Sequence, residues 1–343
     1  MKIFDYLKRG LFWAILALCI IYLLFMSVGF LIYVAIEPNE SSIELLKTIF
    51  ELALWLSVPV LLGLLFLRTK RLIAIGLVFV AIFAFVYIPK IIPRSPEFSP
   101  DVPQITVMTF NLKATAEGIA PLIRDIDTDV VALQELSIEG AQAVETLQDI
   151  YPYQALHPQQ DPNEGQGVIS RYPIEADEYW EYDNVPHTLG HQRVEIDFDG
   201  NIIVLYNTHP WPPLAWETGY NDESHRVVLQ DIVQRTLTEN LPLILLGDFN
   251  MTDSFKEYDL VATHYTDSFQ VAGDGLGYTF PNYKFAPFPR LLRLDYVWHS
   301  DHFQSQFVTV LDHNTQSDHS PVVAQLGLVE SVTDDTTSED NDD

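Results

Sequence analysis

Single polar residues follow several apolar runs in the second part of the sequence. Strands that leave the core at such points can bring their last side chains together in a cleft. Singly these residues are weak signals, because Asp and Asn after a strand are more often turn residues than ligands. Together they predict an active site built from strand ends. They are Asn111 in MTFNLK, Glu135 in VVALQEL, His209 in VLYNTHP, Asp248 and Asn250 in LILLGDFN, Asp295 in RLDYVWHS, and Asp318 with His319 in SDHSP.

The residue types in this set favour a hard metal cation. Carboxylate and amide oxygens are the ligands that Mg²⁺ prefers, with Mn²⁺ as an alternative. The only cysteine, Cys19, lies in an apolar run near the N-terminus, which excludes a disulfide and a Cys-rich metal site. Glu135 directly follows the apolar run VVALQ, so we expect it to be the main ligand, helped by Asn111 and Asp318.

The stretch TQSDHSP, residues 315–321, holds the three residue types of a serine hydrolase triad side by side. Consecutive residues on an extended chain point to alternate faces, whereas triad members converge from separated segments. We therefore do not expect Ser320 to be a nucleophile.

Short β-rich runs alternate with polar, helix-compatible stretches between residues 104 and 329. This alternation predicts an α/β domain with sheets at the centre and helices outside. Asp199-Gly200, between two of the runs, predicts a tight hairpin. The expected strands are 105–110, 130–133, 167–169, 194–198, 202–207, 243–246, 294–298 and 322–326, and the expected helices are 118–127, 139–150 and 224–239.

Three apolar runs predict a membrane domain over residues 1–92. Residues 11–36 carry no charge and are long enough to cross a bilayer core of about 30 Å at about 1.5 Å per residue. Residues 50–67, which contain Pro59, and residues 72–89 are shorter, and we expect them to complete a set of three transmembrane helices. The alternative is that these two runs form one re-entrant hairpin.

The basic residues flanking these runs indicate the orientation, because short loops rich in Lys and Arg tend to stay in the cytoplasm. Such residues precede the first run and separate the second from the third, whereas the first loop is acidic. We expect a multi-pass plasma-membrane protein whose chain beyond residue 95 is extracytoplasmic. The proline-rich residues 93–103 are expected to form a stalk, and residues 330–343 an acidic disordered tail.

The charge balance changes after the membrane segment. Residues 1–94 hold nine of the 19 Lys and Arg and five of the 47 Asp and Glu, so the rest holds 10 basic and 42 acidic residues. A non-specific nucleic-acid binder needs a basic face to displace counterions from phosphates. The composition therefore disfavours nucleic acid as a partner.

The motifs and their order resemble the endonuclease/exonuclease/phosphatase superfamily, which includes pancreatic deoxyribonuclease, apurinic endonucleases, neutral sphingomyelinases and inositol polyphosphate 5-phosphatases. The resemblance covers roughly residues 103–328, with TFN, QE, GVISRYPI, NTHP, GDFN, LDYVW and SDHSP in the family order. It implies a four-layered α/β sandwich, two central β-sheets flanked by helices, over residues 104–329. It also implies a metal-dependent hydrolase of phosphoester bonds.

The resemblance further implies a role for each motif residue. His319 would accept the proton of the attacking water, with Asp295 holding its ring. Asp248 would orient the water or the metal's hydration shell, and Asn250 would donate to a phosphoryl oxygen. His209 would contact the phosphate or assist the leaving oxygen, the alternative being a structural hydrogen bond. The other histidines match no signature position and are expected to be structural.

Two aromatic loops bear on the substrate. Residues 209–216, HPWPPLAW, and residues 278–292, YTFPNYKFAPFPRLL, adjoin the motifs. Aromatic side chains are favoured at membrane interfaces and in apolar clefts, so Trp211 and Tyr278 are candidate substrate-binding residues. A lid that folds back over the core is an equal alternative. Arg193 in HQRVEI is a candidate phosphate ligand or, equally, a salt-bridge partner.

The whole arrangement looks like membrane-bound bacterial members of the superfamily related to VanJ-type glycopeptide-resistance proteins, which act on the diphosphate of polyprenyl carriers. This likeness favours hydrolysis of a phosphorylated lipid at the outer membrane face. One alternative is an extracytoplasmic nuclease acting on DNA or RNA, which the acidic composition disfavours. The other is an inactive membrane adaptor, which the complete set of signature residues disfavours.

Overall fold

The computed structural model describes residues 2–35, 42–92, 94, 96, 99, 101–183, 185–186, 189–215, 219–282 and 289–329. The chain divides into two compact units. One comprises Met1–Ile92 with Ser254–Lys256, and the other comprises Pro93–Asp253 with Glu257–Asp343. The predicted acidic tail, 330–343, lies outside the described residues, as do Pro93 and Pro100 of the predicted stalk.

The first unit is helical. Its helices are α1 (Lys2–Ala35), α2 (Ser42–Leu54), α3 (Ser57–Phe66) and α4 (Lys70–Ile91). Two of them, α1 and α4, are long and apolar enough to cross a membrane. The run predicted as one helix over 50–67 is instead a bent pair, because α2 and α3 meet at 46°. The described residues therefore give two spans, or three if the bent pair crosses the membrane.

The break between α2 and α3 falls just before Pro59. Pro59 lies in the first turn of α3, where the missing amide hydrogen costs no helical bond. The bent pair fits either a broken span or the re-entrant hairpin, so three crossings stay a prediction.

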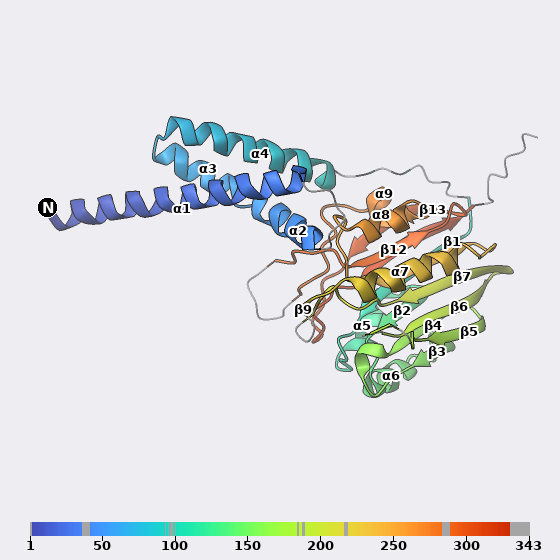
Figure 1. Cartoon of the computed structure of the whole chain (residues 1–343). Helices are drawn as coiled ribbons and strands as arrows, with labels where there is room; N and C mark the ends of the chain where they lie inside the picture. Colours follow the sequence, from blue (N-terminus) through green and yellow to red (C-terminus); the bar gives the residue numbers. More distant parts are fainter. Residues whose placement is uncertain are drawn as a thin grey trace, which may run out of the picture. The chain divides into compact units, whose positions relative to one another are not determined.

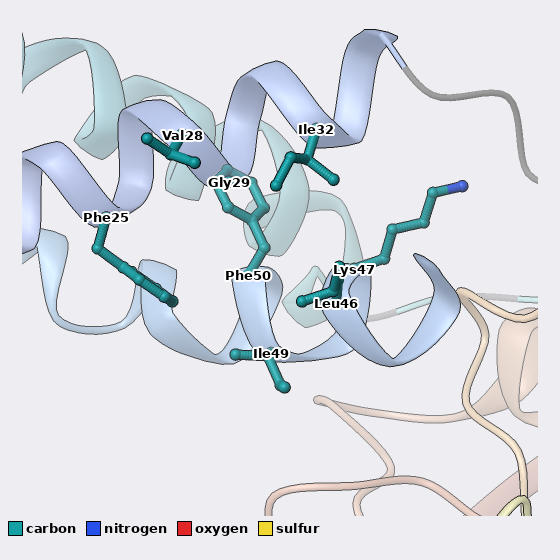
Figure 2. A pocket seen from close by; sticks show the side chains of 8 residues that line it. All are labelled: Phe25, Val28, Gly29, Ile32, Leu46, Lys47, Ile49 and Phe50. Atoms are coloured by element: carbon teal, nitrogen blue, oxygen red, sulfur yellow. The ribbon is translucent and has the colours of Figure 1, made fainter. Parts of the chain in front are cut away.

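Apolar side chains of this unit face outward. Phe66 and Phe85 are 78% and 82% exposed, which suits a lipid-facing surface and would be costly in water. An apolar pocket of about 90 Å³ lies between α1 and α2, where Gly29 leaves room for the ring of Phe50 (Figure 2). It is lined by Phe25, Val28, Gly29, Ile32, Leu46, Lys47, Ile49 and Phe50.

The second unit contains two six-stranded mixed sheets. The first sheet has the order β13-β14-β1-β2-β4-β3 and the second β11-β12-β10-β7-β6-β5. The strands are β1 (Gln104–Asn111), β2 (Val130–Gln134), β3 (Tyr153–His157), β4 (Gln166–Ser170), β5 (Ile174–Trp180), β6 (His191–Phe198), β7 (Asn201–Thr208), β10 (Leu243–Asp248), β11 (Thr266–Asp267), β12 (Asp295–His299), β13 (Phe303–Val310) and β14 (Val322–Leu328), with the small pair β8 (Leu214–Ala215) and β9 (Gly219–Tyr220) apart.

The sheets pack face to face and helices cover their outer faces. Inward side chains of both sheets, such as Val107, Val168, Ile196 and Leu246, form one buried core. A second buried cluster joins the outer face of the first sheet to α5 and α6, and α7 covers the second sheet (Figure 1). The four-layered α/β sandwich is therefore confirmed. The helices are α5 (Ile119–Ile126), α6 (Ile138–Glu145), α7 (Glu223–Thr236), α8 (Lys256–Ala262) and α9 (Ser268–Ala272), with a 3₁₀ turn η1 (Pro162–Glu164).

Each sheet has one parallel pair at its centre, β1 with β2 and β7 with β10. The carboxyl ends of parallel strands lie at the same edge of a sheet. This topology places the ends of all four strands at one rim of the sandwich, together with the start of antiparallel β12, whose Asp295 lies opposite Asp248.

All eight predicted strands and all three predicted helices are present. The predicted hairpin at Asp199-Gly200 is present too, with φ of 53° and 90°. Three longer strands escaped prediction, namely β3, β5 and β13. They lie at sheet edges and are only partly buried, so their sequences lack a strong apolar signal.

Candidate active site

The end of β1 connects two buried carboxylates. The Asn111 side-chain amide donates to Glu135 Oε1 and to Asp248 Oδ2, each at 2.9 Å. Asn111 and Asp248 are almost completely buried. Glu135 follows β2 in a left-handed conformation with φ of 52°, which turns its side chain toward Asn111 and costs a non-glycine residue free energy. Two carboxylate oxygens thus share one donor.

A histidine and a third carboxylate form the opposite side. His319 Nδ1 lies 2.9 Å from Asp295 Oδ2, and His319 Nε2 lies 3.6 Å from Asp248 Oδ2. The chain next to His319 is anchored by Ser317, whose hydroxyl accepts from the His319 amide and donates to the Asn111 carbonyl. The distant residue Asp295, and not the adjacent Asp318, is therefore the acid partner of His319.

A second histidine approaches the same carboxylate. His209 Nε2 lies 3.6 Å from Asp248 Oδ2 and 3.8 Å from Glu135 Oε1. Its Nδ1 lies 3.2 Å from the carbonyl oxygen of Asn163, at the η1 turn. That carbonyl can only accept, so Nδ1 carries the hydrogen and Nε2 faces the carboxylates.

The electrostatics of the site follow from burial and mutual charge. Burial opposes a charged His319, but Asp295 and Asp248 outweigh it and raise its pKa to about 10. Burial prevails for His209 and lowers its pKa despite Asp248. Burial likewise raises the pKa of Asp248 to about 6 and raises the pKa of Glu135. A positive partner opposes this effect and favours the ionised form of both carboxylates.

The turn after β10 holds the next polar residues. Gly247 has φ of 140°, and a Cβ there would lie 1.9 Å from the Thr208 carbonyl oxygen, so only glycine fits. Asn250, with φ of 50°, donates its amide hydrogen to Asp248 Oδ1 and its side-chain amide to the Pro210 carbonyl. This turn fixes the Asp248 carboxylate and directs Asn250 to the same rim.

A lysine borders the site. The Lys113 ammonium bonds to Asp318 Oδ2, and the Lys113 amide donates to Asn111 Oδ1 at 2.9 Å. Lys113 and Ala114 both have positive φ, 48° and 58°. The carboxylate of Asp318 therefore faces a cation of the protein itself.

A family model described as the endonuclease/exonuclease/phosphatase family matches residues 108–319, more than half of the chain. The chain belongs to this family. Members hydrolyse phosphoester bonds and depend on divalent metals, and the buried acid and histidine cluster of this chain suits that chemistry. A comparison with curated proteins gives no match.

Solved structures share the family fold. The endonuclease/exonuclease/phosphatase from Bacteroides vulgatus is 17% identical, covers 66% of this chain and 99% of its own, and has a TM-score of 0.54. The endonuclease/exonuclease/phosphatase from Beutenbergia cavernae is 22% identical, and the match covers 66% of this chain and 72% of that chain, with a TM-score of 0.52. A truncated Caenorhabditis elegans TDP2 is 16% identical, and the match covers 65% of this chain and 97% of that chain, with a TM-score of 0.54. At these identities the likeness concerns the fold alone.

The donor set of this family member fits a hard cation. Oxygens from Glu135 and Asp248 converge on one amide, and Asp295 Oδ1 is buried with no hydrogen-bond donor among the described residues. Among the described residues, Asp248, Asp295 and His319 form a group whose ligand atoms lie within 4.8 Å of one another. Within that group, Asp295 and His319 already bond each other.

The predicted substrate residues lie elsewhere or in loops. Arg193, on β6, bonds Glu239 at 2.6 and 3.0 Å and Glu195 at 2.8 Å, so it has carboxylate partners in place of a phosphate. Trp211 follows β7 and Tyr278 precedes β12, and both are half-buried. Their part in substrate binding stays a prediction. Residues 283–288 of the second aromatic loop lie outside the described part of the chain.

Sequence reasoning missed the buried residues that support the site. Gln134 donates to Asn207 Oδ1 at 2.7 Å, and Asn207 donates to the Leu133 carbonyl, which ties the two sheets together below the rim. His191 Nδ1 lies 2.8 Å from Thr208 Oγ1 and 3.3 Å from the His209 amide. A polar residue within an apolar run was the available signal for Gln134 and Asn207, whereas His191 follows a glycine at the start of its strand and gave none.

Proposed function

We propose that this chain is a membrane-anchored, Mg²⁺-dependent hydrolase that cleaves a phosphate ester or diphosphate of a lipid by attack of water. One observation carries the proposal. Asp248 Oδ2 lies at the centre of a buried set formed by Asn111, His209 and His319, with Asp295 behind His319. This arrangement can position a water and move its proton within a site that excludes bulk solvent.

The metal would be held by Glu135 with Asn111 and Asp318, and Mn²⁺ is an alternative to Mg²⁺. When bound, such an ion lowers the pKa of water and neutralises charge on phosphoryl oxygens. To bind the ion, the Asp318 carboxylate would have to be shared between the metal and Lys113. Asn111 would bind it through its side-chain amide oxygen, Oδ1, which also accepts from the Lys113 amide.

The protein's own groups then carry the proton and the phosphoryl charge. Asp248 orients the water, whose oxygen forms a bond to phosphorus while the bond from phosphorus to the leaving oxygen breaks. His319 accepts the water's proton through Nε2, and Asp295 fixes Nδ1 as the protonated nitrogen. Asn250 contacts a phosphoryl oxygen, and His209 contacts another once the negative charge of the substrate lets its Nε2 take up a proton. Because its pKa is raised to about 10, His319 becomes a base only when added positive charge offsets Asp248 and Asp295.

The helices and loops support the lipid substrate and the location. Two or three N-terminal helices are long and apolar enough to cross a membrane. The basic residues that flank them favour a plasma-membrane protein with its catalytic domain outside the cytoplasm. Aromatic residues such as Trp211 and Tyr278 beside the site suit a substrate at the membrane surface. A periplasmic-type reporter fused to the C-terminus should be active, and cytoplasmic reporter activity would refute this orientation.

Hydrolysis by the full chain in detergent tests the chemistry. It is followed as inorganic phosphate for the polyprenyl diphosphate and the phosphoinositide, as phosphocholine for sphingomyelin, as nitrophenol for bis-nitrophenyl phosphate and as cut strands for DNA. The panel is a polyprenyl diphosphate, sphingomyelin, a phosphoinositide, bis-nitrophenyl phosphate and plasmid DNA, each with Mg²⁺ and with chelator. We expect preference for the phosphorylated lipid, loss of activity on chelation and loss in Asp248→Ala. Release that survives both would sink the proposal, and preferred cleavage of DNA would make the chain a nuclease.

A further inference from the structure

We infer that Lys113 binds the terminal phosphate of the substrate and selects a doubly charged phosphate, a monoester or terminal diphosphate, over a diester. The inference rests on the proposed function and extends it to substrate class. It assigns a role to a residue that none of the signature motifs contains.

The charge of the site favours a cationic side chain beside the substrate. Glu135, Asp248, Asp295 and Asp318 gather four carboxylates at the rim where an anionic substrate must bind. One divalent ion offsets only part of this charge, and electrostatic repulsion would fall hardest on a substrate with two negative charges. The Lys113 ammonium adds positive charge on the Asp318 side, and it also acts on Glu135.

The exposure of its side chain lets Lys113 reach a substrate. The Lys113 side chain is 49% exposed, whereas that of Asp318 is 11% exposed. An ammonium has three donors, and one bond to a carboxylate leaves others for a phosphate oxygen. The bond to Asp318 therefore orients Lys113 and leaves its other ammonium hydrogens available for a phosphate oxygen.

The backbone conformation at Lys113 also indicates a role for its side chain. Lys113 and Ala114 lie in consecutive left-handed conformations that glycine would adopt at lower cost. Hydrogen bonds hold this turn against the metal side of the site, since the Lys113 amide donates to Asn111 Oδ1 and the Ala114 amide donates to the Glu135 carbonyl. A strained turn that carries a long cationic side chain indicates a role for that side chain.

Calorimetric titration of the full chain in detergent with Mg²⁺ tests the inference without turnover. The probes are inorganic phosphate, which carries the second charge, and dimethyl phosphate, which does not. We expect Lys113→Gln to weaken phosphate binding about tenfold, the low end for a charge-assisted bond at a half-exposed site, and to lower the preference for phosphate over dimethyl phosphate. Lys113→Arg should keep most of both.

Arg124→Gln is the matched control, because it also removes one cation and one carboxylate pair, with Asp149, at an exposed position on α5. It should leave both affinities unchanged, and circular dichroism should show all variants folded. Unchanged phosphate binding in Lys113→Gln, or equal weakening of both probes, would overturn the inference. A chain that hydrolyses nothing but binds phosphate through Lys113 would refute the proposed function alone.

Discussion

Two histidines on opposite sides of the site face the same atom yet differ in charge. His319 Nε2 and His209 Nε2 each lie 3.6 Å from Asp248 Oδ2. The pKa of His319 is raised to about 10, whereas that of His209 is lowered. Both are buried, so the difference lies at the other ring nitrogen, where His319 meets the Asp295 carboxylate and His209 meets a neutral carbonyl. The second partner decides whether a buried imidazole carries charge.

Removing the charged histidine should have the largest effect. His319→Ala deletes both the proposed proton acceptor and the group that balances two carboxylates, and we expect kcat/KM to fall about 10⁴-fold, the upper range for general acid–base catalysis. Steady-state phosphate release measures it, with Arg124→Gln as the control for stability. A loss below tenfold would show that His319 is not the base.

Removing the neutral histidine should cost less. His209→Ala deletes the proposed contact to the phosphoryl group, and we expect a loss of about 10²-fold in kcat/KM, within the range for a single lost donor. His209→Gln should recover part of it. If His209→Ala were as damaging as His319→Ala, the two rings would not have separate roles.

A histidine without a carboxylate partner extends the comparison to stability. Burial lowers the pKa of His191 to about 3, below its unfolded value, so the unfolded chain binds more protons between about pH 3 and 6.5. The stability from the neutral ring is therefore present above pH 6.5 and is lost as pH falls. We expect about 2 kcal/mol less stability from this group at pH 5 than at pH 7.

Denaturant unfolding of His191→Gln at the two pH values checks this expectation. The variant should be less stable at pH 7 but should lose less stability on acidification. An unchanged pH dependence would place the responsible proton elsewhere, for instance on His225, whose pKa burial lowers to about 4.

Metal addition should narrow the difference in pKa between His319 and His209. Positive charge beside Asp248 should lower the pKa of His319 by at least about one unit and change that of His209 less, because His319 owes its charge to the carboxylates. Imidazole ¹⁵N resonances followed with and without Mg²⁺ report both values. No movement of the His319 resonance would place the cation away from this carboxylate group.

The residues of the site were more predictable than their partners. Asp295 and His319 are 24 positions apart, yet their motifs and strand ends predicted that they would meet. The carbonyl that sets the protonation of His209 belongs to Asn163, in a 3₁₀ turn that no periodicity marks. The partners of Arg193 come from its own strand and from the chain after α7. Contacts between such segments depend on tertiary packing, which local patterns do not specify.

The backbone at the rim has a consequence for protein engineering. Lys113, Ala114, Glu135 and Asn250 all have left-handed φ angles, between 48° and 58°. Glycine at any of them would relieve conformational cost, and thermostability screens reward such changes. We therefore expect a library selected for heat resistance alone to collect glycines at these four positions and to lose turnover at three of them, Lys113, Glu135 and Asn250, whose side chains we propose to act in the site. Screens of this enzyme family member should hold them fixed, or select for stability and activity together.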